Sequence, residues 1–353
     1  MEKNRCIYNS DVTWKYCTTL ELLQTPYTII DWCTSYLKIM FLGIAGCAFY
    51  NILSGVLRGL GDAFSALVYL LVSTVINIIL DLLFVAKFGM GVNGVALATV
   101  IAQAVSAILC LIRLSKMKDL FDLNRKYLKW NGKYGKNIIR LGVPSGLTQA
   151  IFSMAMIIVQ SLTNSFGEMF IAANVIVMRV DGFAMLPNFS FGTAMTTYSG
   201  QNIGAAKNDR VTKGAKQGTL IAVLTTTFIT SLILIFGRQL MGIFTATTEL
   251  VDLSRCMMGI IAAGYIAMAV TQSLSGVMRG AGDTMTPMWI SLFTTIVVRV
   301  PVAYGIAHFT KSATFPNGRQ ECVFISLLCS WLIGAIMTTI FYLRGKWKNK
   351  ALR

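Results

Sequence analysis

Long apolar runs alternate with short polar connectors along most of the chain. Each run has about 20 or more mostly apolar residues, the length that an α-helix needs to cross a bilayer. The runs are too long for strands and lack a period-two alternation. We therefore predict an all-α polytopic membrane protein with nine transmembrane helices, at about 36–60, 64–87, 91–114, 138–164, 169–199, 215–237, 251–278, 286–308 and 322–343.

The composition agrees with a chain whose solvent is mostly lipid. Its 353 residues are 55% hydrophobic and only 13% charged, and the mean hydropathy is +0.64. Soluble proteins carry about 25% charged residues. The eight cysteines form no CxxC pair and most lie in apolar runs. We interpret them as reduced thiols, which form neither a disulfide framework nor a metal site.

The basic residues, which give a net charge of +16, are unevenly distributed between the connectors. If successive connectors alternate sides, 20 Lys and Arg fall on one side of the membrane and five on the other. The positive-inside rule then places the richer side in the cytoplasm, including the linker 115–137 and the basic tail 345–353. Alternation argues against one basic face for nucleic acid. We expect a multi-pass protein of the cell membrane, with the lipid bilayer as its partner and no nucleic acid.

One decapeptide occurs twice. Residues 53–62 read LSGVLRGLGD, and residues 274–283 read LSGVMRGAGD. Each copy leads from the end of an apolar run into a cytoplasmic connector, where glycine permits a tight turn and Asp can cap the next helix. We predict two structural turns, formed by Arg58, Gly61 and Asp62 in the first copy and by Arg279, Gly282 and Asp283 in the second.

The spacing of the two copies indicates an internal repeat. They lie 221 residues apart, so the six helices of 138–344 repeat a first half of which 36–114 provides three. About 80 residues, or three helices, have no counterpart at the N-terminal side. Segment 1–35 begins with a polar stretch that cannot span a membrane, and we predict that it is irregular. We expect the N-terminus to be replaced or truncated.

The order of the motifs resembles a known transporter family. RGLGD, NIILD and GMGVNGVALATVIAQ are followed by LGVPSG, GQNIGAAK and RGAGDT. In combination they are similar to the multidrug and toxic compound extrusion transporters. The resemblance implies two six-helix lobes in an inverted V around a central cavity, and export of organic cations in exchange for Na⁺ or H⁺. By this comparison the chain lacks the first three helices of its first lobe.

One helix pair carries the strongest candidate for ion coupling. Asn77 and Asp81 are four residues apart and share a helix face. Thr99 lies at a similar depth on the returning helix. Their oxygens suit Na⁺, and a buried Asp can also carry a proton, although Asp81 could instead be a hydrated helix-end residue. The resemblance matches these residues to the family's first-lobe site, which also uses an Asp on the absent first helix, so we expect an incomplete site.

Weaker candidates lie in the second half of the chain. Where some family members have acids on the seventh and tenth helices, this chain has Phe152 and Met268. It therefore resembles the members that couple through the first lobe. The candidates for a substrate cavity are Gln149, Arg179, Asp181, Met268 and Arg299. Ordinary packing, or an ion pair between Arg179 and Asp181, is the alternative reading of this set.

Three functions remain open from the sequence. The leading one is multidrug efflux by Na⁺- or H⁺-coupled antiport of organic cations, carried out by a monomer without a cofactor. The alternatives are a non-transporting fragment of such a transporter, and a lipid-linked saccharide flippase of the same broader fold group. The sequence has no GxxxxGK[ST] motif for nucleotide binding and no nucleophile–base pair, so we expect neither ATP-driven transport nor an enzyme.

Overall fold

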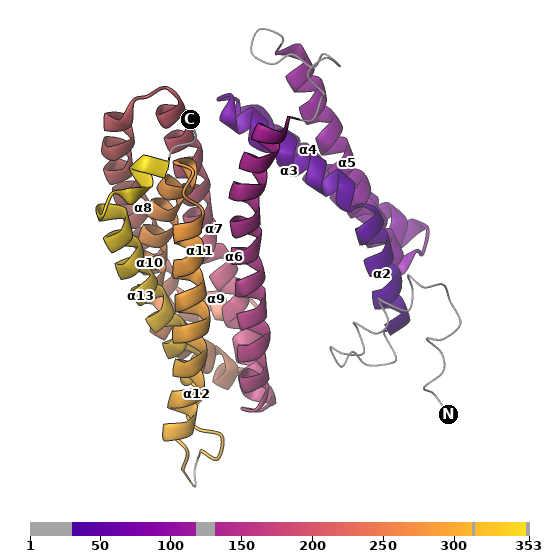
Figure 1. The fold of residues 1–353 in the computed structure, drawn as a ribbon. Helices are drawn as coiled ribbons and strands as arrows, with labels where there is room; N and C mark the ends of the chain where they lie inside the picture. Colours follow the sequence, from indigo (N-terminus) through magenta and orange to yellow (C-terminus); the bar gives the residue numbers. More distant parts are fainter. Residues whose placement is uncertain (1–29, 118–130, 313–314, 351–353) are drawn as a thin grey trace. The chain divides into compact units, whose positions relative to one another are not determined.

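The computed structural model describes residues 30–117, 131–312 and 315–350. Within these ranges the regular structure is entirely helical, which confirms the predicted fold class. The chain divides into two compact units, Met1–Lys129 and Trp130–Arg353, and their boundary falls inside the predicted linker. Figure 1 colours the helices along the sequence, with indigo and purple in the first unit and magenta to yellow in the second.

The first unit packs α3 and α4 against α5. The sequence predicts one helix over 36–60, whereas the structure has two, bent by 45° at Gly43. At the bend the backbone approaches α5 closely, because the side chain of Val100 on α5 occupies the space where a Cβ on Gly43 would lie. The elements of this unit are α2 (Ile30–Leu42), α3 (Ile44–Gly59), α4 (Ala63–Leu82), η2 (Leu83–Lys87) and α5 (Gly91–Lys116).

The start of α2 corrects the prediction that 1–35 is irregular. This helix begins at Ile30, with Asp31 in its first turn. A carboxylate there is favoured by the partial positive charge at a helix N-terminus. The remainder of the predicted irregular segment, 1–29, lies outside the described residues.

The second unit is a larger helix bundle built around α10, which packs against α7, α8 and α13. Several helices run beyond the predicted apolar spans, and α6 begins at residue 132 rather than 138. Hydropathy marks only the part of a helix that lies in lipid, while backbone bonding continues into polar residues. The elements are α6 (Gly132–Asn164), α7 (Glu168–Gly204), α8 (Asn208–Ile235), α9 (Gly237–Gly242), α10 (Thr248–Gly280), α11 (Met285–Leu292), η4 (Phe293–Arg299), α12 (Val300–Phe309), α13 (Cys322–Leu343) and η5 (Lys346–Lys350).

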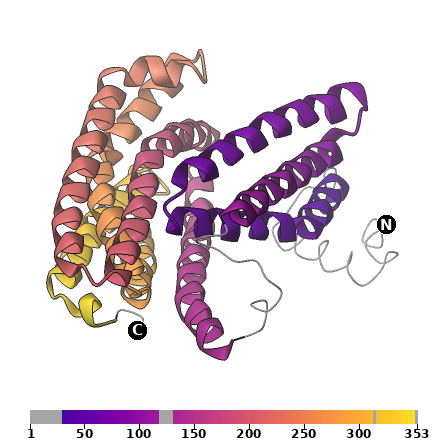
Figure 2. The ribbon, with the colours of Figure 1, turned by 90° about the horizontal axis from the view of Figure 1, so that it is seen from above.

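The number of helices able to span a membrane agrees with the predicted nine. Eight in the described ranges are long and apolar enough, and the bent pair α2 and α3 makes a ninth if it crosses as one. The continuous helix run from α11 through η4 to α12 is one of the eight. Figure 2 views the same helices from above, with those of the second unit gathered as a bundle.

Small residues bring α7 and α10 into backbone contact. A Cβ on Gly276 would lie 2.4 Å from the carbonyl oxygen of Gly192, and one on Gly280 would lie 2.4 Å from that of Thr196. Close approach at small residues is how membrane helices gain packing energy without a hydrophobic driving force. We call these four residues the α7–α10 seam.

The predicted basic tail folds back in part onto the second unit. Trp347 on η5 is only 3% exposed and belongs to an apolar cluster with Met278 of α10 and Val211 of α8. Its indole Nε1 donates to the Tyr342 carbonyl at 2.9 Å, and the two rings are stacked. An apolar anchor therefore lies among the lysines of this segment.

Candidate functional site

The predicted coupling residues of the first unit lie on α4 and α5. The side-chain Nδ2 of Asn77 donates to Oγ1 of Thr99 at 3.4 Å, and this hydroxyl donates to the Val95 carbonyl at 3.0 Å. The structure thus brings Asn77 and Thr99 together across the two helices. Both side chains are polar groups on mostly apolar helices, where they have few alternative partners.

Asp81 lies one turn along α4 from this pair. Its Oδ1 is buried and accepts no hydrogen bond. Two residues later the helix changes to the π-helical segment η2, and such segments occur frequently at functional sites. A buried carboxylate oxygen without a partner costs free energy unless a proton, a cation or water satisfies it. The donor set of carboxylate, amide and hydroxyl oxygens fits Na⁺ as well as a proton.

Gln103 is a further polar residue of this hairpin that the sequence reasoning missed. It lies on α5 one turn after Thr99, and its Oε1 is buried without a hydrogen-bond donor. The four-residue spacing from Thr99, which places both on one helix face, is the signal that could have found it. We call Asn77, Asp81, Thr99 and Gln103 the first-unit polar site. Among the residues that the structure describes, no group of three His, Cys, Asp or Glu could hold a metal ion.

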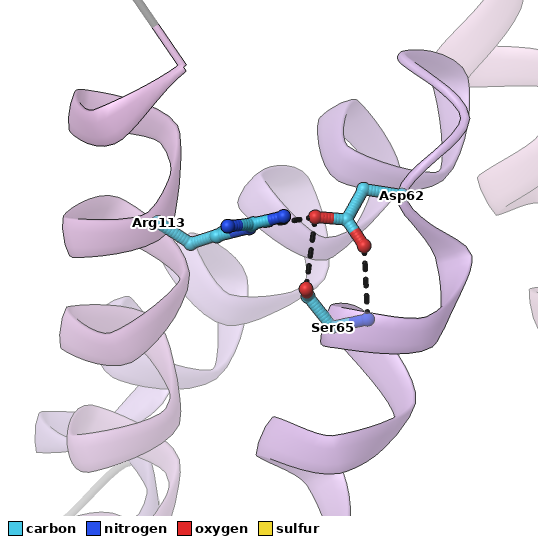
Figure 3. Close-up of polar contacts among 3 residues, drawn as sticks. All are labelled: Asp62, Ser65 and Arg113. Carbon is cyan, nitrogen blue, oxygen red and sulfur yellow. Dashed lines mark hydrogen bonds and ion pairs between the residues drawn. The ribbon is translucent and has the colours of Figure 1, made fainter.

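The first copy of the repeated decapeptide ends in a capped turn (Figure 3). Ser65 donates to the Asp62 carboxylate from its backbone N–H at 3.1 Å and from its hydroxyl at 2.8 Å. Arg113, at the end of α5, donates from Nε to Oδ2 of Asp62 at 2.7 Å. Hydrogen bonding from Arg113 holds the pKa of the Asp62 carboxyl below its usual value, against the opposing effect of burial.

The second copy repeats the cap in the second unit. The Asp283 carboxylate accepts from the Thr286 N–H at 3.2 Å and from the Thr286 hydroxyl at 2.7 Å. Gly61 and Gly282 have φ values of +94° and +87°, which only glycine adopts readily. Arg58 and Arg279 occupy the last turns of α3 and α10. Both copies therefore form a glycine turn followed by an Asp cap.

The candidate cavity residues of the second unit separate into two groups. Gln149 and Arg179 are exposed on α6 and α7, and Met268 is 8% exposed within the apolar core of the unit. Arg179 forms no ion pair with Asp181, because residues two apart point to different faces of a helix.

Asp181 and Arg299 instead approach each other inside the second unit. Arg299, on η4, is 7% exposed and interacts electrostatically with the Asp181 carboxylate of α7. Tyr265 of α10, which the sequence reasoning did not identify, completes the cluster, because it interacts electrostatically with the Asp181 carboxylate. We call these three residues the second-unit polar cluster.

Comparisons with known proteins cover both units. The sequence model of the MatE family matches residues 17–83 and 144–305. The chain is 30% identical over 299 residues to the probable multidrug resistance protein YoeA of Bacillus subtilis, and 30% identical over 333 residues to the probable multidrug resistance protein YpnP of the same strain. These alignments cover 83% and 94% of this chain but 65% and 73% of the relatives, so the chain spans about two thirds of the length of these curated proteins.

A solved structure has the same fold. An outward-facing multidrug resistance MATE family transporter superimposes with a TM-score of 0.86 at 21% identity, over 96% of this chain and 75% of that one. At this identity the match concerns the fold alone. The family match covers well over half of the chain, and a relative at 30% identity is covered over 73% of its length. The chain therefore belongs to the multidrug and toxic compound extrusion (MatE) family of membrane transporters, which are not enzymes.

Proposed function

We propose that this chain takes part in multidrug efflux, exporting organic cations in exchange for Na⁺ or H⁺ that binds at the first-unit polar site. The observation that carries the proposal is the unpartnered Oδ1 of Asp81, one turn from the hydrogen-bonded Asn77 and Thr99. An ionisable residue within a membrane-spanning helix marks an ion pathway by default. The names of the two Bacillus relatives support drugs as the substrate class.

The chemistry of the site supports a cationic coupling species. An ionised Asp81 supplies one negative charge, and the Asn77 and Thr99 side chains one turn away supply neutral oxygens that can share a small hard cation. Protonation of Asp81 would neutralise the same charge. Because either ion removes an uncompensated charge from an apolar helix pair, either can favour a different conformation from that of the empty site.

The proposal is tested by dye accumulation in a bacterial host that lacks its own efflux pumps. Cells expressing the chain should retain less of a fluorescent organic cation than vector controls, and Asp81→Asn should restore retention to the vector level. Thr74→Val is a matched control on α4, since the Thr74 hydroxyl is exposed and bonds only to the Leu70 carbonyl of its own helix. Equal retention with wild type and vector would overturn the proposal and favour a non-transporting chain.

The coupling ion can be identified in lipid vesicles that contain the purified protein. An imposed Na⁺ gradient at constant pH and an imposed pH gradient without Na⁺ are compared as drivers of dye movement. The effective gradient should lose its effect in Asp81→Asn, because both ions need the same carboxylate. Dye movement that ignores both gradients would contradict cation-coupled antiport.

Orientation and substrate contacts follow from the same proposal. The excess of basic residues supports a cytoplasmic location for the linker and the C-terminus. The exposed Gln149 and Arg179 are the candidates for contact with substrate, together with Asp181, Arg299 and Met268 of the unit interior. Substitution of Gln149 by Ala should change the relative export of different dyes without abolishing export.

A further inference from the structure

We propose that Asp181 of the second-unit polar cluster is a proton-binding site, with Tyr265 and Arg299 as the groups that respond to its protonation. This site is separate in sequence and in fold unit from the first-unit polar site. The three side chains come from α7, α10 and η4, so the site joins three elements of one bundle. It can exist whether or not the chain exports drugs.

The strong hydrogen-bonding capacity of the cluster is only partly used. Oδ1 of Asp181 and Nε of Arg299 are both buried without a hydrogen-bond partner. Both terminal nitrogens of Arg299 lie 3.6 Å from Sδ of Met156, and the Tyr265 hydroxyl donates to Sδ of Met258 at 3.2 Å. A thioether is a weak acceptor, so each polar group retains capacity for a stronger partner.

The two protonation states of Asp181 favour different partners for Arg299. An ionised Asp181 can accept hydrogen bonds from both Arg299 and Tyr265. A protonated Asp181 is neutral and no longer attracts the guanidinium, which can then stay on Met156. In an apolar interior the difference between these states is amplified, because unpaired charge is costly there.

A proton fits the cluster better than a metal cation does. The guanidinium of Arg299 carries a permanent positive charge, and a metal ion on Asp181 would meet it in a medium of low dielectric constant. Like charges a few ångström apart repel several times more strongly there than in water. A proton neutralises the carboxylate and leaves no second ion beside the guanidinium. Among the described residues, Tyr265 and Arg299 are the titratable groups that act on this carboxylate from the surrounding helices.

The surrounding contacts hold Tyr265 in place. Asn188, two turns along α7 from Asp181, donates from Nδ2 to the Tyr265 carbonyl at 3.3 Å and accepts from the Thr226 hydroxyl at 2.7 Å. The Tyr265 ring packs against Trp331, with ring centroids 5.7 Å apart. Arg299 is therefore the member that is free to change partners, between Asp181 and Met156 on α6.

Infrared difference spectroscopy of the purified full chain tests the site directly. Lowering the pH should produce a protonated-carboxyl band, and Asp181→Asn should remove one titrating component of it. Asp81→Asn should leave that component in place. Asp252→Asn is the surface control, because Asp252 is 58% exposed and pairs only loosely with Arg238 at 3.8 Å.

The neighbours provide a second readout that a purely structural role would not produce. Arg299→Gln should move the midpoint of the Asp181 component by about one unit to higher pH, since the positive charge favours the carboxylate, and Arg299→Lys should restore most of it. An infrared titration of Asp181→Asn that superimposes on that of wild type would overturn the proposal. If the Asp181→Asn protein aggregates and cannot be measured, the Arg299→Gln variant decides instead. A pH midpoint of the Asp181 component that is the same in Arg299→Gln and in wild type would overturn the proposal. A chain that keeps this component but exports no dye would contradict the proposed function alone.

Discussion

Nε of Arg113 lies 2.7 Å from Oδ2 of Asp62 and ties the end of α5 to the cap of α4, 51 residues earlier in the chain. Removing the cap with Asp62→Ala should destabilise the first unit by about 1 kcal/mol, whereas Asp62→Asn keeps an oxygen for the Ser65 N–H. We expect thermal unfolding in detergent to rank wild type above Asp62→Asn and Asp62→Ala lowest. An Asp62→Ala protein as stable as wild type would contradict this role.

The same carboxylate gives a pH dependence of known sign. The pKa of Asp62 is lower in the folded chain than its usual value of about 4, so the ionised group stabilises the fold above that pH. This stabilisation is lost as the pH falls through the lowered pKa. The difference in unfolding temperature between wild type and Asp62→Asn should therefore be present at neutral pH and disappear in acid. A constant difference at all pH values would show that the charge contributes nothing.

The α7–α10 seam should be intolerant of a single methyl group. Gly276→Ala forces a Cβ against the Gly192 carbonyl, and overpacking of this kind costs about 1–3 kcal/mol. Gly259 lies on the same helix, and a Cβ added there would meet no atom within 4 Å, which makes Gly259→Ala the matched control. We expect thermal denaturation to show a loss only for Gly276→Ala. Equal unfolding temperatures for the two variants would contradict backbone contact at the seam.

The buried Trp347 of the C-terminal tail should contribute to the stability of the second unit, although it lies outside the membrane spans. Trp347→Ala removes a buried indole and should destabilise the second unit by about 3 kcal/mol. Trp347→Phe keeps a ring against Tyr342 but loses the Nε1 donor, so its loss should be smaller. The exposed Lys346 offers a control, since Lys346→Ala should leave the unfolding temperature unchanged.

Loss of one neutral ligand at the first-unit polar site should weaken ion coupling without abolishing it. Thr99→Val removes the hydroxyl that accepts from Asn77 and keeps a side chain of similar size. The concentration of coupling ion needed for half-maximal dye export should rise roughly three- to tenfold, the equivalent of one hydrogen bond. If this concentration is the same in Thr99→Val and in wild type, Thr99 does not contribute to ion binding.

The proposed orientation is tested with a C-terminal fusion. A fluorescent protein that matures only in the cytoplasm should be bright when joined after residue 353, and an alkaline phosphatase that works only in the periplasm should be inactive there. The excess of basic residues on the side of the C-terminus is the physical reason. The opposite pair of results would reverse the topology.

The sequence predicts features that depend on one helix or on adjacent helices. Apolar run length indicates the spans, and the antiparallel geometry of one hairpin brings Asn77 to Thr99, as the hydrogen bond between them shows. Gln103 was also within reach of sequence reasoning, because it follows Thr99 by four residues on the same helix face. The repeated glycine and Asp of the decapeptide likewise predict a local turn and cap.

Features that depend on the rotation and crossing of distant helices are not predictable in this way. Run length does not tell which face of α10 carries Tyr265 toward α7, or that Arg113 reaches Asp62. The bend at Gly43, where Val100 of another helix lies against the backbone, is also not visible in a hydropathy pattern. Each of these features depends on a contact between helices that only the packed structure defines.

The π-helical segment η4 gives the second unit a way to move Arg299 alone. Near the cluster, the Asn188 side chain of α7 donates to the Tyr265 carbonyl of α10 and links these two helices. A π-helical turn holds an extra residue, and sliding it along a helix rotates the residues that it passes by about 100°. On η4 such a shift would rotate Arg299 about the helix axis and move its guanidinium away from Met156. The helices on either side of η4 would keep their positions.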